Sequence, residues 1–339
     1  MNRREALRIT AVAGLSTAFG GGITAAVLRD AKLRRVRDTR THMGTVVTLT
    51  TIHPRAATAR EMNEAAFAEM ARLERILSRH DPSAAVGRLN ARGSLADPPL
   101  ELLEVLAFAA LLSERSEGAF DVTMTPLLDL SRSAFASTGK PPTPESIRAA
   151  RSLVNWRGVE FDAGSVRLVR PGMSITLDGI AKGFVVDRTL AALTDRGAER
   201  VLVDAGGDMA TGGSRVEADP WTVGVQDPRR AERTVDLIRL GGECVATSGD
   251  YLQSFTSDRR HHHIIDPRTG RSPLHSSSVS VVARSAMAAD ALSTAIMVLG
   301  PRDGAALVER YAGASALIVS KSGEIVRTPA FSGPVTLEV

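Results

Sequence analysis

The order in which strand and helix patterns follow one another limits the possible folds of this chain most strongly. Residues 44–52 are rich in β-branched side chains, as in a strand. A helix is expected next, because five apolar residues recur at spacings of three and four: Met62, Ala66, Met70, Leu73 and Leu77. The folded region should therefore begin with a strand and a long amphipathic helix that packs against a sheet.

The remaining patterns alternate irregularly between helix and strand. Helices are expected over residues 100–116, 144–154, 180–196, 286–299 and 302–311. Strands are expected over a hairpin at 159–169 and over 174–177, 200–203, 221–225, 235–240, 244–246, 263–265, 279–283, 315–320 and 323–327. Small polar residues predict a surface loop over 134–144. Antiparallel returns dominate this order, so the expected fold class is α+β and not a doubly wound sheet.

Charge and cysteine content exclude several kinds of partner and site. The chain of 339 residues carries a formal net charge of +4. Nine of its 42 basic residues and three of its 38 acidic residues lie within residues 1–41, which leaves 33 against 35 in the rest. A nucleic-acid surface needs a basic excess in the folded domain, so we expect no nucleic-acid partner. The single cysteine, Cys244, excludes an intrachain disulfide and a multi-cysteine metal cage.

The N-terminal residues have the pattern of an export leader. An Arg3-Arg4 pair precedes an uncharged stretch over residues 9–28, after which basic residues return. Twin arginines indicate the export route for folded proteins, so we expect a periplasmic protein, retained at the inner membrane where the leader stays attached. The chain is therefore divided into a leader or anchor over residues 1–40 and one domain over residues 41–335.

The segment Thr176-Leu-Asp-Gly-Ile-Ala-Lys-Gly183 is a candidate for an anion-binding turn. A strand that enters a helix through Asp178-Gly179 exposes backbone N–H groups at the helix N-terminus, and Lys182 adds a positive charge. The segment lacks the spacing of a Walker A loop and of a Rossmann glycine motif. Taken alone, its residues leave open the alternative of a capped helix with a solvated lysine.

An acidic residue and two hydroxyl residues share one face of the helix expected over residues 286–299. Ser293 and Thr294 follow Asp290 by three and four positions, and their neighbours are apolar or small. A buried aspartate is costly unless it is paired or bound to a cation. Hard oxygen ligands at this spacing suit Mg²⁺ better than zinc. Pairing of Asp290 with an arginine is the alternative.

Three consecutive histidines precede an Asp-Pro turn. On a strand, His261 and His263 point to one face and His262 to the other, so the three cannot form a compact zinc site by themselves. One neutral histidine can instead act as a general base. A solvated histidine run before the turn is the other interpretation.

Together these segments resemble the ApbE-type FAD:protein FMN transferases. Eight blocks follow the family's order: Thr41-His-Met-Gly-Thr45, Ser78-Arg-His-Asp-Pro-Ser83 with Leu89-Asn90, Gly118-Ala-Phe-Asp121 with Pro126-Leu127, Ile180-Ala-Lys-Gly183, Gly206-Gly-Asp208, Thr247-Ser-Gly-Asp-Tyr251, His263-Ile-Ile-Asp-Pro-Arg-Thr-Gly270 and Ala289-Asp-Ala-Leu-Ser-Thr294. The leader, residues 176–181 and His262-His263 resemble most closely the NosX-like branch, which is associated with maturation of the nitrous-oxide reductase system.

The resemblance implies a fold, an activity and a set of partners. The fold would be a duplicated T-fold with antiparallel sheets and packed helices. The activity would be that of a periplasmic enzyme that splits its substrate FAD with the help of Mg²⁺ and releases AMP. The FMN would be attached through its phosphate to a threonine or serine of an acceptor protein, which we expect to be membrane-associated.

The resemblance also implies roles for individual positions. FAD contacts would fall on Met43, His80, Ala119, Phe120, Asp121, Thr176, Asp178, Lys182 and the backbone of Ile265. The metal would be held by Asp290, Ser293, Thr294 and the carbonyl of Gly179. His263 would be the general base.

Three positions depart from the family pattern. His80 stands where many members have tyrosine, Thr176 replaces an aspartate, and Ser293 replaces a second aspartate at the metal site. These departures leave two other functions open. One is an FAD-binding carrier or assembly factor without turnover, and the other is a pyrophosphatase that forms FMN and AMP with water as the nucleophile.

Overall fold

The computed structural model describes residues 33–331. The predicted leader lies outside this range, except for its C-terminal end. That end is part of the folded domain, because strand β1 (Arg34–His42) pairs along its whole length with β2 (Thr45–His53). The described fold thus includes residues 34–40, which precede the predicted domain start at residue 41. Four of the nine residues of β1 are arginines and only Val36 is buried, so the strand lacks an apolar run. Within residues 33–331, no helix is long and apolar enough to cross a membrane.

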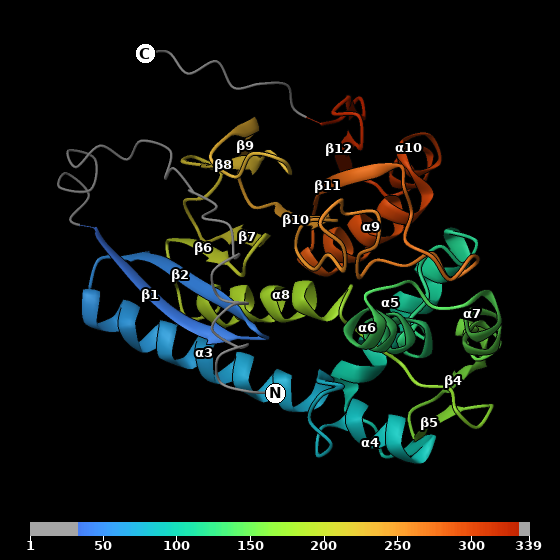
Figure 1. Cartoon of the computed structure of the whole chain (residues 1–339). Coiled ribbons are helices and arrows are strands. Elements are labelled where there is room, and N and C mark those ends of the chain that lie inside the picture. Colours follow the sequence, from blue (N-terminus) through green and yellow to red (C-terminus); the bar gives the residue numbers. More distant parts are fainter. Residues whose placement is uncertain (1–32, 332–339) are drawn as a thin grey trace.

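One antiparallel sheet of eight strands forms the framework of the protein (Figure 1). Its strand order is β1-β2-β6-β7-β10-β11-β12-β13. The strands not yet given are β6 (Arg200–Asp204), β7 (Asp208–Gly212), β10 (Cys244–Gly249), β11 (Ser276–Ala283), β12 (Ser315–Ser320) and β13 (Ile325–Arg327). Every neighbouring pair in this sheet is antiparallel, which confirms the predicted α+β class.

The sheet consists of two halves with the same order of elements. The hairpins β1-β2 and β6-β7 form the first half, and β10-β11 and β12-β13 form the second. In each half, helices lie between the two hairpins in the sequence: α3 (Ala56–Leu77) and α8 (Ala181–Thr194), then α9 (Ala286–Leu299) and α10 (Pro301–Val308). Strands β7 and β10 join the halves. This arrangement agrees with the duplicated fold that the resemblance implies.

Helices α3, α8 and α9 form a layer against the sheet, and α8 packs against both of the others. The apolar side chains whose spacing predicts α3 are all buried in the main core: Met62, Ala66, Met70, Leu73 and Leu77. They pack with residues of the sheet, such as Leu49, and of α8, such as Phe184. The predicted helix and its inward face are therefore confirmed.

A two-stranded hairpin contributes to a second, smaller core. Its strands are β8 (Trp221–Gln226) and β9 (Thr234–Leu240). The buried Trp221 side chain belongs to this core, together with Met209 of β7 and Val245 of β10. The sheet is thus covered on both faces where its two halves meet, which holds the backbones of β7 and β10 in place.

A helical unit with a small sheet lies between α3 and α8 in the sequence. Its elements are α4 (Ala85–Arg92), β3 (Ser94–Ala96), α5 (Leu100–Arg115), α6 (Thr125–Thr138), α7 (Pro144–Arg151), the 3₁₀ turn Trp156–Gly158, β4 (Val159–Phe161) and β5 (Ser165–Leu168). Asn90 ties this unit to the chain before α8. Its side chain donates to the Ile175 carbonyl at 2.8 Å and accepts from the Ile175 N–H at 2.7 Å.

The surface loop predicted over residues 134–144 is wrong in its first part. Helix α6 continues to Thr138 and ends at Gly139, which takes the left-handed conformation with a φ of 67°. The small polar residues do not break the helix, because the hydroxyls of Ser137 and Thr138 donate to carbonyls one turn earlier. The loop is therefore confined to residues 139–143.

Two predicted strands are also absent from the described residues. Residues 174–177 join no sheet, because their backbone groups already have other partners. The Asn90 side chain is hydrogen-bonded to the backbone of Ile175, and the Thr176 N–H donates to the Val122 carbonyl. Residues 263–265 form no strand either, and they lie between two isolated bridges, Ser254 with His262 and Asp266 with Arg271. Apolar side chains alone do not distinguish these segments from paired strands.

Gly183 sets the distance between α8 and α9. A Cβ atom at this position would lie 2.1 Å from the carbonyl oxygen of Ala286, which is backbone and cannot move aside easily. We expect Gly183→Ala to lower the free energy of unfolding by about 3 kcal/mol, as for overpacking in a rigid core. Gly164→Ala is the control, since the nearest atom to its Cβ lies 3.6 Å away. Equal urea midpoints for the two variants would contradict this close approach.

Candidate active site

Three charged side chains from different elements meet where the two halves of the sheet join. Lys182 lies in the first turn of α8, Asp208 begins β7 and Asp290 belongs to α9. The Lys182 Nζ atom lies 3.0 Å from Asp208 Oδ1. The N–H of Gly183 donates to Asp290 Oδ2 at 3.0 Å. The N-terminal end of α8 therefore faces a carboxylate, the charge that its dipole favours.

The two carboxylates of this cluster are almost fully removed from water. The exposed fraction is 1% for Asp208 and 4% for Asp290. Burial and the charge of Asp208 raise the pKa of Asp290 well above its usual range. Burial lowers the pKa of Lys182, but the charges of both aspartates outweigh this effect and raise it above its ordinary value. Two carboxylates and one ammonium leave negative charge that a cation or a proton must compensate.

Hydroxyl oxygens and the Gly179 backbone lie beside the charged cluster. On β10, Ser248 Oγ lies 2.7 Å from Ser293 Oγ and 3.3 Å from Thr294 Oγ1. A Cβ atom on Gly179 would lie 3.0 Å from Thr294 Oγ1, so the Gly179 backbone packs directly against this hydroxyl. The structure thus brings together the four residues that the sequence assigns to a metal: Gly179, Asp290, Ser293 and Thr294.

The chemistry of these oxygens fits a hard divalent cation. Carboxylate, hydroxyl and carbonyl oxygens are the ligands that Mg²⁺ takes. The buried Asp208 Oδ2 atom has no fixed hydrogen-bond donor among the described residues, so either a proton shared with the neighbouring Asp290 carboxyl or a cation can satisfy it. No group of three or more His, Cys, Asp or Glu side chains within residues 33–331 could hold a metal, so a cation bound here would also need water or substrate oxygens. Ser293 Oγ also donates to the Asp290 carbonyl at 2.9 Å, so it is partly engaged.

In the turn before α8, Thr176 and Asp178 make contacts within the protein. The Thr176 hydroxyl accepts from the Asp178 N–H at 3.2 Å. The Asp178 side chain is half exposed, and its Oδ2 atom lies 3.4 Å from Nε of Arg79. Asp178 therefore pairs with an arginine whose side chain is largely buried. Ligand contacts for Thr176 and Asp178 stay predictions.

His263 has a fixed ring orientation. Its backbone N–H donates to the Gln253 carbonyl at 3.0 Å, and its Nδ1 atom lies 3.2 Å from the same oxygen. A carbonyl can only accept, so the proton of a neutral ring sits on Nδ1 and Nε2 keeps its lone pair. Burial lowers the pKa of His263 to about 4, and the charges of Arg132 and Lys182 act in the same direction. His263 is thus a neutral histidine within the electrostatic reach of Lys182.

The other predicted contact residues lie on separate loops. Met43 connects β1 and β2 with a φ of 51°, and its N–H donates to Glu74. His80 is exposed in the loop after α3. Ala119 and Phe120 are buried in the main core, whereas Ile265 is buried in a separate small cluster of α6 and α7. Their ligand contacts stay predictions.

Asp121 is engaged by its own loop. Its Oδ1 atom accepts from the Thr123 N–H and hydroxyl at 2.7 and 2.6 Å, and its Oδ2 atom accepts from the Trp156 N–H at 3.0 Å. Burial raises the pKa of Asp121 against the effect of these bonds. Its carboxylate therefore has an evident structural role, and the predicted contact with a ligand is untested.

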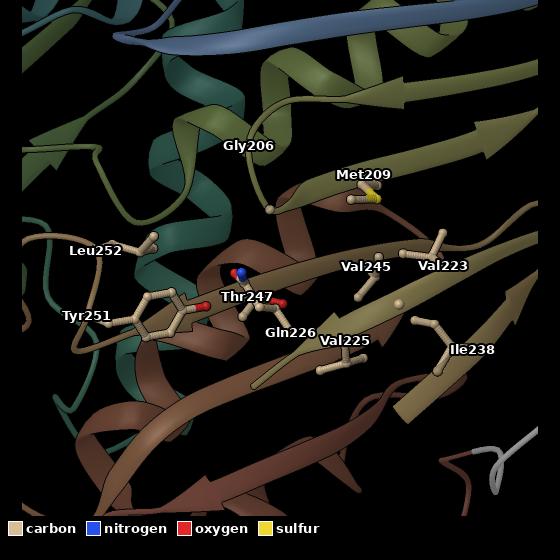
Figure 2. Close-up of a pocket in the computed structure, with 12 residues that line it drawn as sticks. Gly206, Met209, Val223, Val225, Gln226, Ile238, Val245, Thr247, Tyr251 and Leu252 are labelled. Atoms are coloured by element: carbon tan, nitrogen blue, oxygen red, sulfur yellow. The ribbon is translucent and has the colours of Figure 1, made fainter. Parts of the chain in front are cut away.

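A small cavity lies behind the charged cluster, between the main sheet and the β8-β9 hairpin (Figure 2). Met209 of β7 and Thr247 of β10 line it. Their strand neighbours Asp208 and Ser248 point to the opposite face of the sheet, because side chains alternate along a strand. The free volume is about 50 Å³, which holds only a few water molecules. The charged cluster, and not this cavity, is therefore the candidate active site.

Sequence reasoning did not single out two residues that the structure places in the cluster. Asp208 pairs with Lys182, and Ser248 contacts the hydroxyls on α9. Both sit in the blocks Gly206-Gly-Asp208 and Thr247-Ser-Gly-Asp-Tyr251, so a signal was present. Their partners are distant in sequence, however, and only the pairing of β7 with β10 brings them together.

Comparisons with known proteins point to one family. A family model described as the ApbE family matches residues 43–318. An FAD:protein FMN transferase of Vibrio cholerae is 35% identical over 216 residues, which cover 62% of this chain and 64% of that protein. One of Treponema pallidum is 32% identical over 277 residues, 76% of each chain. The crystal structure of the ApbE protein from Thermotoga maritima matches with a TM-score of 0.77 and 32% identity, over 87% of this chain and 97% of that one.

The buried histidine beside the site should make the fold sensitive to acid. Burial lowers the pKa of His262 to about 4 from an ordinary value of 6.5. The unfolded chain therefore binds the proton first, and stability that is present above pH 6.5 is lost as the pH falls toward 4. We expect this residue to cost about 2 kcal/mol of unfolding free energy between about pH 7.5 and about pH 5.

Urea unfolding at the two pH values measures this loss. His262→Gln should reduce the loss by about 2 kcal/mol, whereas His275→Gln, on an exposed loop, should leave it as in the unaltered chain. An identical pH dependence for His262→Gln and the unaltered chain would show that His262 is not the group responsible.

Proposed function

The chain belongs to the ApbE family, and from this premise we propose that it is an FAD:protein FMN transferase. Such an enzyme takes FAD as its substrate and joins the FMN half to an acceptor protein. The activity comes from the names of the relatives, and the candidate active site supplies a physical reason for it.

The observation that carries the proposal is the oxygen-lined cluster at the N-terminal end of α8. Backbone N–H groups and Lys182 there favour an anion, while Asp208 and Asp290 favour a cation. A diphosphate with a divalent ion satisfies both requirements at once. Neither a simple apolar ligand nor a nucleic acid would need this combination of charges.

We propose that Mg²⁺ binds to Asp290, Thr294 and the Gly179 carbonyl, with Ser293 and Asp208 beside it. The bound ion would neutralise negative charge on the diphosphate of FAD. The role of Lys182 is to hold a phosphate oxygen, because its pairing with Asp208 keeps the ammonium charged and fixed in place.

His263 acts as the general base in this proposal. Its Nδ1–H is held by the Gln253 carbonyl, so Nε2 is the atom that accepts the proton of the acceptor hydroxyl. The hydroxyl oxygen of a threonine or serine forms a bond to the FMN phosphorus, and the bond between this phosphorus and the bridging oxygen breaks. AMP leaves with that oxygen.

We further propose where the enzyme acts and on which partner. The twin-arginine leader motivates export to the periplasm, with retention at the inner membrane where the leader remains. A membrane-associated acceptor protein and a role in maturation of the nitrous-oxide reductase system follow from the resemblance to the NosX-like branch. Export of a fusion between residues 1–40 and a reporter that is active only in the periplasm tests the location.

Transfer by the purified full chain tests the main proposal. With FAD, Mg²⁺ and an acceptor protein, we expect a fluorescent flavin band on a denaturing gel and one AMP for each FMN attached. His263→Gln should slow transfer by roughly 10²–10⁴-fold, the usual contribution of a positioned base. Asp303→Asn, on the exposed side of α10, is the control. Full transfer by His263→Gln would remove this residue from the mechanism.

Replacement of Asp290 tests the metal site separately. Asp290→Asn should raise the Mg²⁺ concentration needed for half-maximal transfer by more than about tenfold, because even outer-shell partners of a metal usually contribute that much. A titration with Mg²⁺ measures the shift. An unchanged requirement would mean that the ion, if needed, binds elsewhere.

A reaction without acceptor protein separates the proposal from the two alternatives that the sequence leaves open. A transferase should form little AMP until an acceptor hydroxyl is supplied. A pyrophosphatase would release AMP and free FMN at the same rate with or without acceptor. A carrier would bind FAD without forming AMP under either condition. Chromatography of the nucleotides distinguishes the three.

A further inference from the structure

A second cluster of charged side chains lies outside the candidate active site and joins three segments. Asp250 follows β10 and is fully buried. Arg229, from the loop between β8 and β9, contacts both of its carboxylate oxygens at 2.7 and 2.8 Å. Lys321, which follows β12, places Nζ 2.5 Å from Asp250 Oδ2. One carboxylate thus contacts two cationic side chains that are far apart in the sequence, Arg229 and Lys321.

The cluster is poorly suited to a purely stabilising role. Burial of ions costs several kcal/mol for each, and well-packed apolar residues often give equal or greater stability. Burial raises the pKa of Asp250, but the hydrogen bonds from Arg229 and Lys321 outweigh this effect and hold it below its usual range. The carboxylate is therefore charged at neutral pH. Its directional contacts fix the segments that meet there.

The segment fixed most fully is the loop over residues 250–263. Besides its contact with Asp250, the Lys321 ammonium donates to the Arg259 carbonyl at 2.8 Å. The Arg259 guanidinium donates in turn to the Pro228 carbonyl at 2.8 Å, next to Arg229. Lys321 therefore anchors the loop at both Asp250 and Arg259, and Arg229 and the neighbouring Pro228 carbonyl add contacts at these two points, respectively.

This loop carries the group that orients the proposed base. The Gln253 carbonyl, three residues after Asp250, accepts from the His263 backbone and contacts its Nδ1 atom. The Gln253 side chain also accepts from Arg132 Nη2 at 3.3 Å. A shift of the loop would move this carbonyl, and with it the direction of His263 Nε2.

We propose that Asp250, Arg229 and Lys321 are positioning residues, which lock the loop over residues 250–263 so that His263 presents Nε2 to the acceptor hydroxyl. None of the three needs to touch FAD or the acceptor. The inference rests on the proposed function, because it takes His263 as the base.

The first test compares Asp250→Asn with Asp236→Asn in the full chain. Asp236 on β9 is a matched control, since its fully buried carboxylate also pairs with an arginine, at 2.9 Å from Arg327 Nε, but outside the loop. Both variants should lose stability. Only Asp250→Asn should lower kcat, by roughly 10- to 100-fold as for a misplaced catalytic group, with the KM for FAD changed by less than about twofold.

The second test uses Lys321 and has two readouts, rescue of kcat and hydrogen–deuterium exchange, of which the exchange needs no transfer activity. Lys321→Met removes the charge, whereas Lys321→Arg keeps a donor and should restore most of the kcat that Lys321→Met loses. Hydrogen–deuterium exchange in peptides over residues 250–263 should be faster in Asp250→Asn and Lys321→Met than in Asp236→Asn or the unaltered chain.

The outcomes separate this inference from the proposed function. Equal kcat losses in Asp250→Asn and Asp236→Asn, or full kcat in Asp250→Asn and Lys321→Met, would overturn the inference and leave the transferase intact. An unaltered chain without any transfer would count against the function. In that case the exchange measurement alone tests whether the three charged residues hold the loop. Unchanged exchange in Asp250→Asn and Lys321→Met would show that they do not.

Discussion

The contact between Lys182 and Asp208, beside Asp290, is the constraint on which the rest of the site depends. Buried charges of opposite sign are tolerated only where partners and geometry are fixed, because each ion loses its hydration. The contact therefore specifies how α8, β7 and α9 lie relative to one another. It also leaves negative charge without a full partner. This charge, which a proton or a cation can compensate, is the reason for proposing that a metal and a phosphate bind here together.

The duplicated sheet explains why this cluster forms at one place only among the described residues. Lys182 and Asp208 come from the first half, whereas Asp290, Thr294 and Ser248 come from the second. They meet because β7 pairs with β10 at the seam and α8 packs against α9 above it. A single half would present an incomplete set of charges and hydroxyls. The repeat therefore creates function at its junction, where two similar units contribute different residues.

Local pattern predicted those parts of the fold and site that depend on neighbouring residues. The inward face of α3 and the shared face of Asp290 and Thr294 on α9 follow from helical spacing alone. The pairing of Lys182 with Asp208 could not be predicted this way, since strand register decides it. Residues 174–177 and 263–265 show the same limit: both have strand-like side chains, but side-chain and turn contacts occupy their backbones. Strand β1 was missed for the opposite reason: its arginines give no strand-like side-chain pattern, although every residue of the strand is paired with β2.

The two charge clusters of this protein differ in what they leave unsatisfied, and this difference indicates their roles. Around Asp250, both carboxylate oxygens accept hydrogen bonds from cationic side chains of the protein, so the hydrogen bonding of this carboxylate is complete and the segments that carry its partners are tied together. Around Asp290, two carboxylates share one ammonium, so the contacts are incomplete. Complete ion clusters restrict motion, whereas incomplete ones attract a ligand of the missing charge. In the proposed mechanism the loop that carries His263 fixes the direction of Nε2 in advance, because orientation must be set before the reacting groups meet.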